Sequence, residues 1–258
     1  MHQKTAYSSD NVLLSYIHNK IDNKPTIIFI HGAGSNHTVY KPFFNLNHNF
    51  IAIDIRNHGK SSRSKNITIQ RISEDIWDIC KKEKIKDTIL IGNSLGASIA
   101  LDFYKNHRWN VKKMILLTLF SKRYIKHPVL FNNLASMFYT ILKPFAGKRP
   151  LKFQDYHKYK ERPIWYYPYL DFRGTPITTV LKLVKELFQY PIYAYNIKVP
   201  TLIFVAEKDW STKNELIKSD CKSNKNIKLV ELKSNHVPLV RIYDDVLKGV
   251  NEFLNHKL

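Results

Sequence analysis

Three side chains have the types and the order along the chain that nucleophilic catalysis requires. Ser94 lies in the pentapeptide "GNSLG", which fits the pattern G-x-S-x-G. Asp209 ("VAEKDWS") and His236 ("SNHVPLV") follow it, in the order serine, aspartate, histidine. A serine hydroxyl is a weak nucleophile near neutral pH, so it needs a histidine as base, and that histidine needs an acid to orient it. These residues predict acyl transfer through a covalent intermediate on the serine.

This chemistry also needs hydrogen-bond donors for the negative oxygen of the tetrahedral intermediate, each worth roughly 2.7–4 kcal/mol. The backbone amide of Leu95, directly after the serine and at the start of a helical stretch, is one predicted donor. The other is expected in the loop "HGAG", formed by His31, Gly32, Ala33 and Gly34, because small residues let the backbone approach a substrate closely. Within this loop the Ala33 amide is the predicted donor. A merely flexible turn is the alternative.

The residues around the serine predict how it is presented. An apolar run, Thr88–Gly92, ends just before it, and a helical stretch, Leu95–Tyr104, begins just after it. A serine at such a strand–turn–helix junction, called a nucleophile elbow, projects its hydroxyl above the sheet. Gly92 and Gly96 are needed there because larger side chains would collide with the neighbouring strand and helix. The alternative is a structural turn that happens to hold a serine.

The aspartate and the histidine each follow a short apolar run, so both are expected at carboxyl ends of strands, where open α/β sheets hold their sites. Asp209 has an alternative role as a turn or helix N-cap residue, because Ser211 and Thr212 open a helical stretch. Glu207 is a nearby substitute acid. His236 has the alternative of being an ordinary loop histidine.

The elements that must position these residues alternate along the chain. The expected strands are Gln3–Tyr7, Val12–His18, Thr26–Ile30, Phe50–Ile55, Thr88–Gly92, Val111–Thr118, Thr201–Ala206 and Ile227–Leu232. The expected helices are Ile69–Lys84, Leu95–Tyr104 and a last one marked by Val246, Val250 and Phe253. The first two strands read as a hairpin, and fully apolar runs suit strands covered on both faces. The pattern predicts a mostly parallel, doubly wound α/β sheet.

The alternation stops over residues 120–198, which separate the two parts of the expected core, 1–119 and 199–258. Leu130–Phe145 and Val180–Phe188 show helical spacing, and an aromatic, proline-rich stretch, "RPIWYYPYLDF", lies between them. A structureless loop of this length is uncommon in a compact domain, so the segment is expected to form a helical insertion. It is either a cap that supplies an apolar wall to the site or an insertion that only packs on the core.

Together, the elbow, the His-Gly loop and the downstream acid and base resemble the α/β-hydrolase superfamily of serine hydrolases. "DIRNHGKSS", Asp54–Ser62, is similar to the turn D-x-R-G-H-G-x-S of that family. "HGAGSNHTVY" and "GNSLGA" are most similar to monoacylglycerol-lipase-like esterases. Two positions depart from the family pattern: Asn93 replaces a frequent histidine and Asn57 a frequent glycine.

The resemblance implies the α/β-hydrolase fold with an inserted helical cap and a serine-dependent hydrolysis of carboxylic esters. The expected substrate is a small ester with a hydrophobic portion, and the triad chemistry needs no metal or organic cofactor. Other acyl chemistry on the same residues stays open, namely a thioesterase, acyltransferase, amidase or carbon–carbon bond hydrolase. A non-catalytic binding relative is the remaining alternative.

The formal net charge of +20 is large for 258 residues. Basic chains attract nucleic acids and anionic membranes. No nucleic-acid-binding motif is present, and no nucleic acid is expected as a partner. The excess is mostly lysine, which an AT-biased genome would also produce. Residues 120–173 hold 11 Lys and Arg against 3 Asp and Glu. They predict a weak contact of the cap with anionic membrane surfaces, or they follow the lysine bias of the whole chain.

Cysteine content and the N-terminus favour a cytoplasmic protein. Cys80 and Cys221 match no metal or redox spacing and are expected as free thiols in a reducing compartment. The first residues, "MHQKTAYSSDN", are polar and contain no apolar signal segment.

Overall fold

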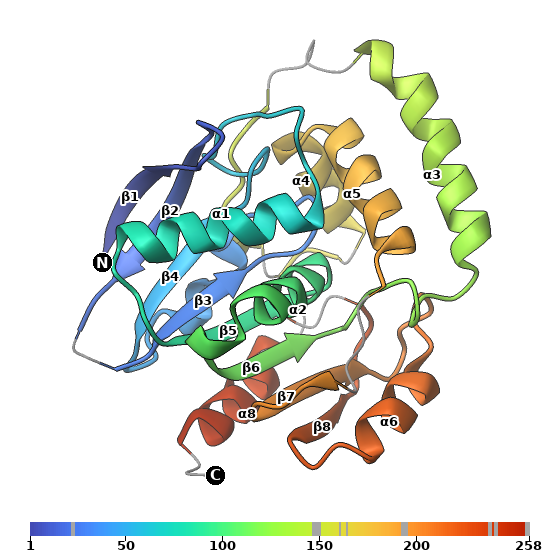
Figure 1. Ribbon diagram of the computed structural model, residues 1–258. Coiled ribbons are helices and arrows are strands. Elements are labelled where there is room, and N and C mark those ends of the chain that lie inside the picture. The colour runs from blue at the N-terminus through green and yellow to red at the C-terminus, as the bar shows by residue number, and fades with distance from the viewer. Residues whose placement is uncertain are drawn as a thin grey trace.

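One sheet of eight strands organises the chain, in the order β1-β2-β4-β3-β5-β6-β7-β8 (Figure 1). The strands are β1 His2–Tyr7, β2 Leu13–Asn19, β3 Thr26–Ile30, β4 Asn49–Asp54, β5 Thr88–Asn93, β6 Val111–Leu117, β7 Thr201–Ala206 and β8 Ile227–Leu232. β2 pairs antiparallel with β1 and with β4, and the other neighbouring strands pair parallel. The mostly parallel sheet is therefore confirmed. This computed structural model describes residues 1–21, 24–145, 151–159, 161–163, 165–191, 196–236, 239 and 242–255.

Helices cover both faces of the sheet, which explains why its strands are apolar on both sides. These helices are α1 Ile69–Lys82, α2 Leu95–His107, α6 Asn214–Lys222 and α8 Tyr243–Asn255. Ile28 and Ile30 of β3 belong to the core beneath α1 and α2. Ile27 and Phe29 of the same strand point to the other face, into a second core with α8 and the 3-10 helix His37–Phe43. The alternation along β3 thus divides the hydrophobic core into two layers.

Among the described residues that follow β6 and precede β7 in the sequence, three segments form α-helices of more than one turn: α3 Pro128–Leu142, α4 Tyr166–Gly174 and α5 Ile177–Gln189 (Figure 1). Leu183 and Leu187 attach α5 to the core beneath α1 and α2. The aromatic, proline-rich stretch holds α4, a helix that the sequence did not predict; Pro168 is tolerated there because it lies in the first turn. The expected insertion 120–198 also contains 146–150, 160, 164 and 192–195, which lie outside the described residues.

Both cysteines, Cys80 and Cys221, are free and buried, as the sequence predicts. Burial raises the pKa of each thiol to about 12, so neither is a reactive thiolate. Among the residues that the structure describes, no helix combines the length and the apolar character that crossing a membrane requires.

Candidate active site

Ser94 lies on a sharp turn between β5 and α2, with φ 53° and ψ −115°. Such a backbone conformation is strained for a residue with a side chain, and the surrounding packing must hold it in place. A Cβ atom at Gly92 would lie 2.3 Å from the Gly96 carbonyl oxygen, and one at Gly96 would lie 2.0 Å from the Ile30 carbonyl oxygen. Gly92 therefore allows the start of α2 to lie against the end of β5, and Gly96 allows it to lie against the end of β3. The expected elbow geometry is present.

The structure brings the three predicted side chains together at the carboxyl ends of β5, β7 and β8. Ser94 Oγ lies 2.9 Å from His236 Nε2, within hydrogen-bond distance. On the other side of the ring, His236 Nδ1 lies 2.7 Å from Asp209 Oδ2. Glu207, the substitute acid, is exposed. A hydroxyl, an imidazole and a carboxylate in this series can move a proton from the hydroxyl to the imidazole, while the carboxylate stabilises the charge that forms.

Asp209 is buried and keeps its charge. Burial alone would raise its pKa, but hydrogen bonds from His236 and Ser211 outweigh that effect and lower the pKa to about 2. Its Oδ1 accepts from the Ser211 backbone N–H at 2.9 Å and from the Ser211 hydroxyl. Asp209 thus also has the turn role that the sequence left open, but α6 begins only at Asn214, so it is no helix N-cap. One oxygen fixes the loop and the other faces the histidine.

His31 holds the first half of the loop 31–34. The Ile55 N–H donates to its Nε2 at 3.1 Å, so the proton lies on Nδ1, which donates to the Gly32 carbonyl at 2.8 Å. Burial lowers the pKa of this ring to about 4, although the Asp54 carboxylate opposes the shift, so the ring is neutral. The Gly32 carbonyl belongs to the same peptide group as the Ala33 N–H, and this contact therefore orients that N–H.

His58 holds the second half of the loop, a role that sequence reasoning missed. The Gly34 N–H donates to His58 Nε2 at 3.1 Å, and His58 Nδ1 lies 3.0 Å from the Arg56 carbonyl oxygen. Burial and the neighbouring His31 lower the His58 pKa to about 3. The signal was present in the "NHG" of the turn after β4. Within the described part of the chain, the Ala33 and Leu95 amides donate no hydrogen bond.

These two neutral histidines predict a loss of stability in mild acid. The unfolded chain protonates both near pH 6.5 and the folded chain near pH 4 and 3, so the unfolded state binds more protons in between. The free energy of unfolding should fall between pH 7 and pH 5 by about 2 kcal/mol for each histidine. Urea unfolding at both pH values measures this fall in the free energy of unfolding.

Two variants separate the contribution of His58 from that of other histidines. H58Q should reduce the pH dependence of the free energy of unfolding by about 2 kcal/mol, whereas H2Q, at an exposed position, should not. Equal pH dependence in the wild type and H58Q would contradict the assignment.

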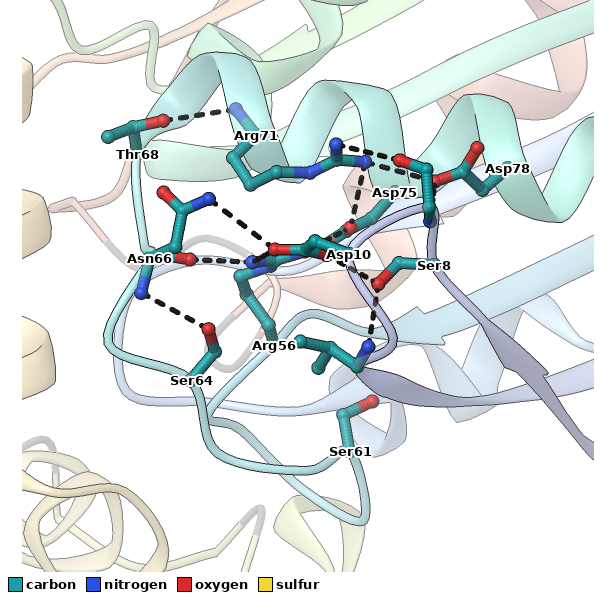
Figure 2. A network of polar contacts seen from close by, with 12 residues as sticks. Ser8, Asp10, Arg56, Ser61, Ser64, Asn66, Thr68, Arg71, Asp75 and Asp78 are labelled. Atoms are coloured by element: carbon teal, nitrogen blue, oxygen red, sulfur yellow. Dashed lines mark hydrogen bonds and ion pairs between the residues drawn. The ribbon is translucent and has the colours of Figure 1, made fainter.

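Arg56 anchors the turn that carries His58. Its buried guanidinium pairs with Asp75 of α1, at 2.5 and 2.6 Å, and with Asp10 of the β1–β2 loop, at 2.8 and 2.9 Å (Figure 2). It also donates to the Asn66 carbonyl. These hydrogen bonds join the turn to α1 and to the β1–β2 loop. Removing one partner of a buried ion pair costs about 3–5 kcal/mol, so the turn is held firmly in place. The loop 31–34 thereby rests on a rigid support.

Asn57, one of the two departures from the family pattern, occupies a position that suits glycine. Its φ is 67°, a value that asparagine tolerates better than most residues. Its side-chain amide donates to the Ser64 carbonyl and, at 3.1 Å, to the Thr179 hydroxyl of α5. The asparagine therefore ties the turn after β4 to the insertion.

A cavity of about 180 Å³ opens at Ser94. Its lining consists of Gly32, Ala33, Ser35, Val39, Asn93, Ser94, Tyr156, Tyr167, Asp171, His236 and Leu239. Asn93, the second departure from the family pattern, lies in this lining and accepts a hydrogen bond from the Thr118 hydroxyl at 3.2 Å. Tyr156, Tyr167 and Asp171 come from the insertion, and no spacing in the sequence pointed to them.

The sheet order and the serine–histidine–aspartate arrangement at the strand ends are those of an α/β hydrolase, and comparison with known proteins shows the family. The model of the alpha/beta hydrolase fold family matches residues 25–240. The chain belongs to this family. A candidate esterase/lipase of Haemophilus influenzae is 31% identical over 117 residues, which are 43% of this chain and 41% of that protein. The 3-oxoadipate enol-lactonase 1 of Acinetobacter baylyi is 31% identical over 83 residues, 31% of each chain. The matched region thus spans well under half the length of these curated relatives.

Solved structures of similar fold superpose on nearly the whole chain. An esterase from Exiguobacterium antarcticum has a TM-score of 0.76 at 17% identity and covers 99% of this chain and 100% of its own. An enol-lactonase from Burkholderia xenovorans has a TM-score of 0.78 at 18% identity, covering 98% and 100%. They establish the fold, and the esterase-like sequence relatives support a hydrolase activity.

Proposed function

We propose that the chain hydrolyses carboxylic esters through an acyl-enzyme on Ser94. The observation that carries this proposal is the continuous hydrogen-bonded series from Ser94 through His236 to Asp209, at 2.9 and 2.7 Å, beside a loop with an available amide. His236 Nε2 takes the hydroxyl proton as Oγ attacks the ester carbonyl carbon. The oxygen of the tetrahedral intermediate is stabilised by the Ala33 and Leu95 N–H groups.

The intermediate collapses when the bond from the carbonyl carbon to the alkoxy oxygen breaks and His236 gives its proton to the leaving alcohol. Water then enters, His236 removes a proton from it, and the hydroxide attacks the acyl-enzyme. The second collapse releases the carboxylic acid and returns the proton to Ser94. Throughout, Asp209 keeps the Nδ1 proton of the ring in place and stabilises the imidazolium.

The size of the cavity favours a small substrate. About 180 Å³ is below the roughly 300–1,000 Å³ of pockets that hold drug-sized ligands. Phe120, at the start of the insertion, packs edge-on against the His236 ring with centroids 5.2 Å apart. We therefore assign the insertion 120–198, through the part of it that the structure describes, as a cap that covers the site and supplies an apolar wall. The acyl portion that fits best is a short one.

An ester series tests the proposal. The kcat/KM for p-nitrophenyl esters should be highest for acetate to butyrate and fall for octanoate and longer chains. A fluorophosphonate probe should label Ser94, which peptide mass mapping identifies. Thioester and anilide analogues of the best acyl group separate ester hydrolysis from other acyl chemistry. Folded protein that hydrolyses no ester and takes no label would overturn the proposal.

The outer face of α3 supports a further proposal about partners, a weak contact with anionic lipid surfaces. Only Ala135 of α3 is buried, and large apolar side chains are exposed along it. They are Val129, Leu130, Leu134, Met137, Phe138 and Ile141. Lys126 precedes the helix and Lys143 follows it. An apolar helix face flanked by lysines complements a negatively charged membrane surface.

Vesicle sedimentation tests this contact. The protein should bind vesicles that contain phosphatidylglycerol more strongly than pure phosphatidylcholine vesicles, and 0.5 M salt should weaken the binding, because salt screens exposed charges. The double substitution L134S/F138S should reduce binding several-fold. W109S removes an exposed apolar side chain outside α3 and should not. Equal binding by L134S/F138S and the wild type would contradict a role of α3.

A further inference from the structure

Asp171 of α4 is a carboxyl in the cavity wall that the reaction on Ser94 does not use. It shares the lining with Ser94 and His236 although it lies far from both in the sequence. A Cβ atom at Gly34 would lie 2.7 Å from Asp171 Cβ, and Gly34 itself has a φ of 86°. The glycine thus permits α4 to approach the loop 31–34 closely. The carboxyl group of Asp171 therefore lies beside the loop whose Ala33 N–H we propose to stabilise the negative oxygen of the tetrahedral intermediate.

Two side chains of the insertion hold this arrangement. The buried Tyr156 hydroxyl donates to Asp171 Oδ1, and it also lies 3.3 Å from the Gly34 carbonyl oxygen. The buried Thr175 hydroxyl donates to the same carbonyl oxygen at 2.8 Å. Since the Gly34 N–H is held by His58, the loop is fixed from the core on one side and from the insertion on the other. Asp171 is therefore locked in position relative to the reacting centre.

The second carboxyl oxygen remains available. Among the described residues, Asp171 Oδ2 makes no hydrogen bond. The atom is not completely enclosed by the protein. Burial raises the pKa of this carboxyl to about 7, although the Tyr156 hydroxyl opposes the shift. Near neutral pH the group exists as both acid and carboxylate. A hydroxyl can bind either form, because it both donates and accepts hydrogen bonds.

Apolar side chains share the cavity wall with Asp171 and with the polar residues Ser35, Asn93 and Ser94. Val39, Tyr167 and Leu239 contribute to the lining. A pocket whose surface is mainly apolar, with a few fixed polar groups, orients a ligand by those groups and takes its discrimination from them. An isolated carboxyl oxygen in such a wall costs free energy unless a ligand supplies the missing donor.

We propose that Asp171 is a substrate-binding residue, selecting esters that carry a hydroxyl group on the part lying in this cavity. The inference rests on the ester hydrolysis proposed for Ser94 and specifies its substrate class. A hydroxyl bound to Asp171 would hold the ester carbonyl against the Ala33 N–H. An ester without the hydroxyl would leave Oδ2 unpaired, which costs about tenfold or more in kcat/KM.

Paired substrates test the selection. One pair, p-nitrophenyl butyrate and p-nitrophenyl 3-hydroxybutyrate, places the hydroxyl on the acyl side; the other, ethyl butyrate and 2-hydroxyethyl butyrate, places it on the alcohol side. The wild type should favour the hydroxylated member of one pair by about tenfold or more in kcat/KM. D171L should lose this preference and D171N should keep part of it. D155N changes a carboxylate of the insertion outside the cavity lining and should keep it fully.

Binding to S94A separates this inference from the ester hydrolysis. Where the acyl side carries the selection, calorimetry should show tighter binding of 3-hydroxybutyrate than of butyrate, and D171L in the S94A background should abolish the difference. Where the alcohol side carries it, ethylene glycol should bind more tightly than ethanol. Absence of ester hydrolysis together with such a preference would reject only the reaction. Equal kcat/KM within both pairs, or a preference that survives in D171L, would overturn the role of Asp171.

Discussion

Replacing Ser94 with alanine should lower kcat for p-nitrophenyl butyrate by about 10⁴-fold or more, with little change in KM. The substitution removes the only atom that forms the acyl-enzyme, the Oγ that lies 2.9 Å from His236 Nε2. The amides of Ala33 and Leu95 stay in place, so a residual rate above that of water should persist. Steady-state kinetics measures the loss, and the absence of a fluorophosphonate adduct in S94A confirms its cause.

A matched control distinguishes loss of the nucleophile from loss of the fold. S219A removes a hydroxyl from an exposed position on α6 and should leave kcat within about twofold. The free energy of unfolding of S94A should lie within about 1 kcal/mol of the wild-type value, since His236 is partly exposed and keeps its hydrogen bond to Asp209. Full activity in S94A would overturn the proposed function outright.

The sequence predicted the sheet well because parallel strands are buried on both faces. Thr26–Ile30 and Thr201–Ala206 are apolar after their first threonine, are buried throughout, and match β3 and β7 residue for residue. The same physics explains why α4 was missed. Its aromatic residues and Pro168 resemble an irregular segment, and the contacts that α4 makes, such as the packing of Asp171 beside Gly34, join residues far apart in the sequence.

The residues of the candidate site also differ in whether the sequence predicts them. Ser94, Asp209 and His236 carry local signals, because each follows a strand that ends at the same edge of the sheet. Asp171 carries none: its place in the cavity depends on how the insertion packs on the core, which no spacing in the sequence encodes. The role of His58 lies between the two, since its turn was noted for its resemblance but its contact with Gly34 requires the folded loop.

Replacing Asp209 with asparagine should lower kcat by about 10⁴-fold while the fold is retained. Asparagine is nearly isosteric, and its oxygen can still accept the bond from the Ser211 N–H. Its amide group, however, would then face His236 Nδ1, where the carboxylate oxygen now lies 2.7 Å away. An N–H donor there turns Nδ1 into an acceptor and moves the ring proton to Nε2. A ring protonated at Nε2 cannot accept the proton of Ser94.

The neighbouring acid supplies the control for this prediction. E207Q changes an exposed carboxylate two residues away and should leave kcat within about twofold, because Asp209, and not Glu207, is hydrogen-bonded to His236 Nδ1. Steady-state kinetics on short-chain p-nitrophenyl esters compares the two variants, and nitrogen-15 chemical shifts of the His236 ring report which nitrogen carries the proton. A larger loss in E207Q than in D209N would reassign the acid to Glu207. Unchanged tautomer and rate in D209N would show that the carboxylate neither orients nor stabilises the base.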